Sequence, residues 1–281
     1  MRPRSLFSST VAAENLLSPE QAKALADKVL SMAKADDTRV SISSDWSGNS
    51  RFAAGEITTS GETTDTTVSI VSTIGKRRAS ASTNILDDAS LRRTVELSER
   101  LAKLSPEDPE IMPELGPQTY SPVGGFIEAT ADLGPETRTA AAKRVIDSAI
   151  ATGRPAGDVF VAGYLEANAG ARAIANSKGL FAYHRSTDAN LSTTVRTPDG
   201  TGSGWASAGA RNWGAINPAA LGERAAQKAV ASRNPSAIEP GMYTVVLEPQ
   251  AVADLVPLLG GAFNGRSADE GRSPFSKKGG G

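Results

Sequence analysis

The chain carries very few of the side chains that enzymes most often use for chemistry. Its 281 residues include one histidine, His184, and no cysteine. Disulfides and thiolate metal ligands are therefore excluded. A zinc site would need carboxylates for its remaining protein ligands, and structural or catalytic zinc sites are rarely built that way. The sequence thus offers no catalytic, cofactor-binding or metal-binding residue that we would assign.

His184 lies in an alternating stretch, residues 180–185 (LFAYHR). A strand here would place Leu180, Ala182 and His184 on one face, with the intervening side chains on the other. Imidazole titrates near neutrality, so a general base is one interpretation. No nucleophile stands at a recognisable spacing, and a surface or half-buried strand histidine is therefore favoured.

Two pairs of adjacent carboxylates are further candidates for acid and base chemistry. They are Asp36 with Asp37, and Asp87 with Asp88. The first pair falls at a predicted helix end and the second at a helix start, where capping in solvent explains them without chemistry. An independent hydrolase that uses His184 or one of these pairs is kept as an alternative.

Two glycine-rich runs imitate phosphate-binding loops. The run at residues 200–205 (GTGSGW) has Trp205 where a dinucleotide fingerprint needs its third glycine. Ser203 is not a nucleophile elbow either, because Thr201 occupies the place of the first glycine of that motif. The run at 260–267 (GGAFNGRS) matches a P-loop spacing but follows a predicted helix instead of a strand. We therefore predict structural roles for both runs, the first as a close backbone approach or a bulge.

Charge and hydropathy exclude two classes of partner. Thirty basic residues face thirty-one acidic ones, giving a net charge of −1 with no sustained basic stripe, so direct nucleic-acid binding is not indicated. The sequence contains no run of about 18 apolar residues, the length that a membrane-spanning helix needs. Residues 1–17 have a faint transit-peptide composition, but a flexible N-terminus and a cytoplasmic protein are favoured.

Periodicity predicts an α+β fold made of two repeated modules. The first, residues 18–104, opens with a helix at 19–35 that has Ser18 as N-cap in a capping box with Gln21. Strands then follow at 38–45 and 51–63, two more flank a turn at Gly75, and a helix over 86–104 closes the module.

Residues 105–134 are proline-rich and predict a linker or an extended crossing segment. The second module, residues 135–237, repeats the order. A helix from Pro135 is followed by a strand at 157–168, two strands joined around Thr187 and Asp188, the glycine run and a helix capped by Asn217. The stretches DTTVSIVSTIGKRRASAS and DANLSTTVRTPDGTGSGWAS are also alike, which supports a duplication.

Residues 238–281 predict the start of a third, β-rich domain that is incomplete. A buried strand is expected at 243–247, followed by a helix from Pro249 that Pro257 bends or breaks. About 40 residues rarely fold alone. We therefore expect that the remainder of this domain is missing from the chain.

Several stretches together resemble the TldD/PmbA family, once called modulators of DNA gyrase and now regarded as zinc metallopeptidases. They are SRFAAGEI, ANSKGLFAYHRSTDANLSTTVRTPDGTGSGWAS, YTVVLEPQAVADLV and GAFNGRSADEGRSPFSKKGGG. They lie in both modules and in the third segment, so the resemblance spans nearly the whole chain. The resemblance also implies a largely β C-terminal domain beyond this chain.

The family implies two kinds of subunit. The TldD kind has a zinc helix with the spacing H-E-x-x-x-H, but this chain shows QAVADLVPLLGGAFN at the corresponding place. The departure matches the TldE/PmbA kind, which pairs with a TldD-type subunit that holds the zinc. The resemblance therefore implies a non-catalytic subunit that supplies an interface and part of a channel for unfolded or extended peptides. A stand-alone peptide- or protein-binding module is the alternative.

Overall fold

The computed structural model describes residues 16–277, so most of the expected flexible N-terminus lies outside the described residues. The chain divides into two compact units, residues 1–235 and 236–281, which are treated separately below. Helices and strands are both abundant, which confirms an α+β fold.

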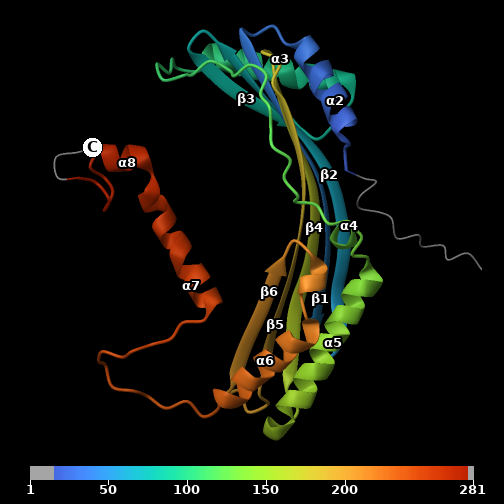
Figure 1. Cartoon of the computed structure of the whole chain (residues 1–281), viewed down its shortest axis with the longest axis vertical. Coiled ribbons are helices and arrows are strands. Elements are labelled where there is room, and N and C mark those ends of the chain that lie inside the picture. The colour runs from blue at the N-terminus through green and yellow to red at the C-terminus, as the bar shows by residue number, and fades with distance from the viewer. Residues whose placement is uncertain (1–15, 278–281) are drawn as a thin grey trace, which may run out of the picture. The chain divides into compact units, whose positions relative to one another are not determined.

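One antiparallel sheet of six strands organises the first unit, in the order β3-β2-β1-β4-β5-β6 (Figure 1). The strands of both predicted modules therefore belong to one sheet. The six strands are β1 (Asp37–Ala53), β2 (Glu56–Ile74), β3 (Arg77–Thr83), β4 (Phe160–Asn176), β5 (Phe181–Arg196) and β6 (Ser203–Ala210).

The two halves of the sheet meet where β1 pairs with β4. This antiparallel ladder runs from Arg39 opposite Asn176 to Ala53 opposite Ala162. On each side of the ladder lies a hairpin, β2–β3 or β5–β6, so the strand order mirrors itself about the β1–β4 pair. The two stretches that suggested a duplication occupy these two equivalent hairpins.

Helices cover one face of the sheet, and they bury the strand side chains that point to that face. In β1 the even-numbered side chains are buried almost without exception, while most odd-numbered ones are half-buried. The helices are α2 (Pro19–Met32), α3 (Asp88–Leu104), α4 (Glu128–Ala131), α5 (Pro135–Gly153) and α6 (Pro218–Ala231), with short 3-10 turns η1 (Arg154–Ala156) and η2 (Trp213–Ala215). Each predicted long helix of the two modules is thus present.

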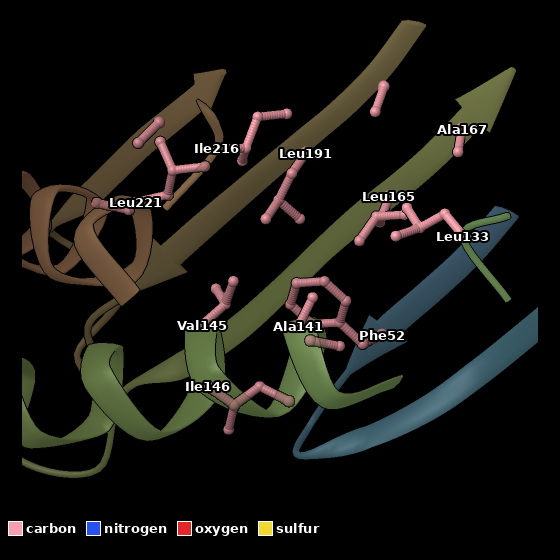
Figure 2. Close-up of a cluster of buried hydrophobic side chains, with 14 of the residues drawn as sticks. Phe52, Leu133, Ala141, Val145, Ile146, Leu165, Ala167, Leu191, Ile216 and Leu221 are labelled. Atoms are coloured by element: carbon pink, nitrogen blue, oxygen red, sulfur yellow. The ribbon is translucent and has the colours of Figure 1, made fainter. Parts of the chain in front are cut away.

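Two apolar clusters lie along the long strands, one beneath α2 and α3 and the other beneath α5 and α6. Val29 of α2 and Leu91 of α3 pack with Val40 and Ile70 of the sheet. In the second cluster, side chains of α5 and α6 pack against Phe52, Leu165 and Leu191, as Figure 2 shows. Burial of these side chains supplies the main driving force for the first unit.

Two predicted strand boundaries are wrong. Residues 51–63 do not form one strand, because β1 continues to Ala53, turns at Ala54 and Gly55, and returns as β2. The turn between β4 and β5 lies at residues 177–180, whereas the predicted joint around Thr187 and Asp188 lies inside β5. Asn176 caps that turn, since its Oδ1 accepts from the N–H groups of Lys178 and Leu180, both at 3.0 Å.

The glycine run after β5 brings β6 close to α6. Gly200 takes a positive φ of 73° in the turn. A Cβ on Gly204 would collide with the carbonyl oxygen of Ala225, and one on Gly202 with that of Ala229. The predicted close backbone approach is confirmed. In the same turn the pKa of Asp199 is lowered to about 2, mainly because the Thr197 hydroxyl donates to its carboxylate.

The second unit contains α7 (Pro249–Leu255), a 3-10 stretch η3 (Val256–Phe263) and α8 (Gly265–Asp269). The helix changes to 3-10 geometry beside Pro257, which confirms the predicted break. The strand expected at 243–247 is wrong, since these residues have no regular structure and Val246 is 96% exposed. A strand needs a neighbour for its backbone groups, and the part of this unit that the structure describes contains no strand.

A buried guanidinium ties α5 to β1 and β2. Arg138 is fully buried, its Nη2 lies 2.9 Å from Oε1 of Glu62, and its Nη1 donates to the Leu133 carbonyl at 2.7 Å. Its Nε contacts Oγ of Ser50 at 3.3 Å. Gly48 leaves the room for this side chain, because a Cβ there would collide with the guanidinium.

We expect Glu62→Gln to lower the free energy of unfolding by about 3 kcal/mol, because it leaves the buried Arg138 charge unpaired. Urea unfolding of Glu62→Gln, Arg138→Met and the double variant measures this loss and the coupling between the two side chains. The coupling should reach about 1 kcal/mol or more. Glu56→Gln, an exposed change at the start of the same strand, is the control. Additive single effects would contradict the role of the pair.

Gly204→Ala should destabilise the first unit by about 3 kcal/mol or more, because the new methyl group meets backbone atoms of α6 that cannot move aside. Gly209→Ala, on the same strand, is the matched control, since a Cβ there would make only ordinary contacts, with Nδ2 of Asn190 at 3.4 Å and the Ala189 carbonyl oxygen at 3.8 Å. Thermal unfolding of both variants is the measurement. Equal midpoints would show that β6 and α6 are not in close backbone contact.

Candidate functional site

The helix-free face of the sheet is polar, and we call it the open face. On β1 it carries Ser41, Ser43, Asp45 and Ser47, and on the neighbouring β4 the register places Arg172 opposite Ser43. None of these side chains is fully buried. A sheet face that needs no apolar core is free to carry binding groups.

An extended segment, residues 105–127, crosses this face, and we call it the strap. Near its start, the Asp108 N–H donates to the Lys76 carbonyl at 2.8 Å. Glu114, whose side chain is only 8% exposed, then lies 3.5 Å from the guanidinium of Arg39 and 3.8 Å from that of Arg78. Both arginines come from the sheet, so these ion pairs hold the strap on the open face.

The far end of the strap is attached to the edge of β5. The Thr187 N–H donates to the Gly125 carbonyl at 3.0 Å, and the Ile127 N–H donates to the Thr187 hydroxyl at the same distance. The guanidinium of Arg185 lies over the ring of Phe126, 3.5 Å from its centroid. Cation–π stacking of this kind fixes the side chains where the strap leaves the groove.

A groove of about 870 Å³ lies between the strap and the sheet. Its floor is Ser41, Ser43, Arg172 and His184, and its wall is the strap from Tyr120 to Phe126. The lining contains two arginines and the histidine but no Asp or Glu. Each arginine has an acidic partner outside the lining, Asp45 at 2.5 Å from Arg172 and Glu128 at 3.7 Å from Arg185. The groove therefore combines apolar side chains with the N–H donors of arginine and histidine.

His184 is an exposed residue of β5 that lines this groove, so the predicted strand histidine is confirmed. Its partner in the β4–β5 register is Arg172. An arginine is a donor only, so it cannot orient the imidazole of a general base. A Cβ on Gly125 would lie 2.9 Å from the imidazole ring, and the strap passes this closely because it has glycine there.

The carboxylates of the two candidate pairs, Asp36 with Asp37 and Asp87 with Asp88, contact backbone N–H groups and lysines of the fold. Asp36 accepts from the Gly75 N–H at 2.8 Å, and Asp37 lies 2.8 Å from Nζ of Lys178. The Asp88 carboxylate pairs with a lysine of α2. Asp87 is the N-cap of α3, and the backbone N–H of Ser90 holds the pKa of its carboxyl below the usual value.

The described residues do not provide a zinc site. Across residues 16–277, no three His, Asp or Glu side chains lie close enough together to hold a metal ion. His184 faces a cation and a glycine, which is no ligand set for zinc. None of the helices described over these residues is long and apolar enough to cross a membrane.

The sequence predicted an extended crossing segment at residues 105–134, and residues 105–127 form it, whereas α4 interrupts its last part. The partners that hold the strap were missed. Glu114, Arg39 and Arg78 are far apart in the chain, and nothing in their local spacing brings them together. The one usable signal was the glycine pair at Gly124 and Gly125, which permits a close approach but does not say to what.

Glu114→Gln should loosen the strap, because the amide keeps the shape but loses the attraction to both arginines. We expect chymotrypsin to cut after Tyr120 several times faster in this variant than in the wild type, with cleavage followed by mass spectrometry. Glu107→Gln, in the same strap but half of an exposed ion pair with Arg77, is the control. Unchanged cleavage would mean that the Glu114 contacts do not hold the strap.

Comparison with known families gives two matches. A model described as the PmbA/TldA metallopeptidase central domain matches residues 127–233, and one described as the C-terminal domain of the same metallopeptidases matches residues 240–281. Together they include β4 to β6, α5, α6 and the second unit. No curated protein matches the chain.

Solved structures share the fold at low identity. A candidate modulator of DNA gyrase from Thermotoga maritima is 19% identical, with a TM-score of 0.78 over 92% of this chain and 59% of its own. A similar protein from Bacteroides thetaiotaomicron is 16% identical, with a TM-score of 0.78 over 91% and 60%. TldE from Thermococcus kodakarensis is 16% identical, with a TM-score of 0.66 over 74% and 47%. The chain thus spans about half to three fifths of these proteins.

Proposed function

Because the chain belongs to the TldD/PmbA family of metallopeptidase subunits, we propose that it is the TldE/PmbA-type, non-catalytic subunit of a heteromeric zinc peptidase. In this proposal a TldD-type partner holds the zinc and cuts unfolded or extended peptides. This chain contributes an interface and part of the peptide channel. The complex would act in the cytoplasm.

The observation that carries the proposal is the composition of the segment where the catalytic kind of subunit has its zinc helix. Residues 250–264, which span most of α7 and all of η3, contain neither histidine nor glutamate. Histidine is the usual nitrogen ligand of catalytic zinc, and a glutamate usually activates the zinc-bound water. The single histidine of the chain lies on β5, among residues that do not fit zinc.

Two further observations support the proposal. TldE from Thermococcus kodakarensis has the same fold over 74% of this chain. The apolar side chains of α7 and η3 are also exposed in the second unit, with Val252 at 43%, Leu255 at 52% and Leu259 at 52%. Apolar side chains exposed together in one segment mark surfaces that other protein covers.

Reconstitution with a TldD-type subunit tests the proposal. We expect the two chains to co-elute on gel filtration and to cut an unfolded casein only together, with loss of activity in a chelator. Zinc analysis of this chain alone should give less than about 0.1 equivalent. The same mixture with the partner's zinc-binding histidines replaced is the matched control.

Two outcomes would contradict the proposal. One is a full equivalent of zinc and peptide cleavage by this chain alone. The other is a chain that binds peptides but never associates with a TldD-type subunit, which would favour the stand-alone binding module.

A further inference from the structure

We infer that the groove under the strap binds an extended peptide along the free edge of β5, and that Arg172 and His184 hold a carboxylate of that peptide. The inference shares with the proposed function only the idea of a peptide ligand. It concerns residues of this chain alone and needs neither zinc nor a partner subunit.

The edge of β5 is only half covered. β4 pairs with β5 from Phe181 to Arg196, whereas β6 pairs only with Ala189 to Arg196. Beside the uncovered half, the strap makes one backbone hydrogen bond, from the Thr187 N–H to Gly125. Residues 182–185 of this uncovered half line the groove.

The backbone groups of this edge point toward the groove. The Thr187 N–H faces the strap, away from β4, and this direction alternates along a strand. The N–H and C=O groups of Phe181, Tyr183 and Arg185 therefore point the same way. In the described residues they have no backbone partner on that side. Donors and acceptors at every second residue are the pattern that an added strand satisfies.

The size of the groove suits a short extended segment. Five residues of strand span about 17 Å, which matches the length of edge from Phe181 to Arg185. A volume of about 870 Å³ is also within the range of small ligand sites. Tyr120, Val123 and Phe126 on the strap would contact apolar side chains of the peptide.

The donors that remain free in the groove suit a carboxylate. Arg172 and His184 are opposite each other across β4 and β5, so their Cβ atoms lie within about 5.5 Å. Nη1 of Arg172 is used by Asp45 at 2.5 Å and by the Ala171 carbonyl, but Nε and Nη2 have no hydrogen-bond partner among the described residues. Two free N–H groups of one guanidinium match the two oxygens of a carboxylate.

Fluorescence anisotropy on the full chain tests the inference. The probe is a fluorescein-labelled octapeptide of Ala, Thr and Val with a free C-terminal carboxylate, compared with the same peptide as a C-terminal amide. We expect the acid to bind at least tenfold more tightly than the amide. Arg172→Gln and His184→Gln should each weaken binding of the acid fivefold or more and leave the amide unchanged.

Two controls separate recognition from general effects. Arg196→Gln removes an exposed charge from the other end of β5 and should not change binding. Two N-methylated peptides are compared, one methylated at its odd-numbered amides and the other at its even-numbered amides. Only one of these sets of N–H groups would donate to β5, so only one of the two peptides should lose binding. Circular dichroism confirms that each variant is folded.

Equal affinity for acid and amide, or no loss in Arg172→Gln, would overturn the carboxylate site. Equal tolerance of N-methyl groups in both registers would overturn pairing with β5, and so would the absence of binding at millimolar peptide. Because zinc and the partner subunit are absent, these results are independent of the reconstitution experiment.

Discussion

The antiparallel pairing of β1 with β4 is the constraint on which the rest of the first unit depends. It runs along most of both strands and joins two similar halves that would otherwise each expose a long sheet edge. Because side chains alternate along paired strands, this one register decides the face of every residue on both strands. A shift of β4 by one residue against β1 would bury Arg172 and expose Leu165.

That register gives the two faces different tasks. The helix-covered face contains the two apolar clusters and the buried ion pair of Arg138 with Glu62. The open face has no core to build, so it can carry polar and charged side chains at little cost in stability. The strap crosses this second face, and the groove arises because Glu114 and Gly125 fix the strap at two separate places.

The proposed division of labour between two kinds of subunit rests on what each region carries. The second unit contains the segment that the proposal compares with the zinc helix of a TldD-type subunit, and in this chain residues 250–264 are mostly apolar and contain neither histidine nor glutamate. The first unit has the groove, to which we assign peptide recognition in our proposal. Charge, hydrogen-bond geometry and apolar contact suffice for binding a peptide, whereas hydrolysis at zinc needs a ligand set that the described residues do not offer.

The sequence by itself determined what depends on neighbours in the chain. Helix starts at Ser18, Asp87 and Asn217 were predictable because a side chain caps a backbone N–H three residues later. The presence of His184 on a strand, the close approach of the glycine run and the family followed in the same way. These features need only local spacing or a recognisable stretch of residues.

Only the tertiary structure decided what depends on a partner far along the chain. The turn was placed around Thr187 and Asp188 because these residues fit a loop as well as a paired strand, and pairing with β4 carries them inside β5. The local signal at Asn176 and Gly179, which does set the turn at 177–180, was missed. The expected strand at 243–247 stays irregular because the described part of its unit offers no neighbour for it. The groove was invisible for the same reason, since its walls come from β1, β4, β5 and the strap, and a fold brings these together only through contacts that no local pattern encodes.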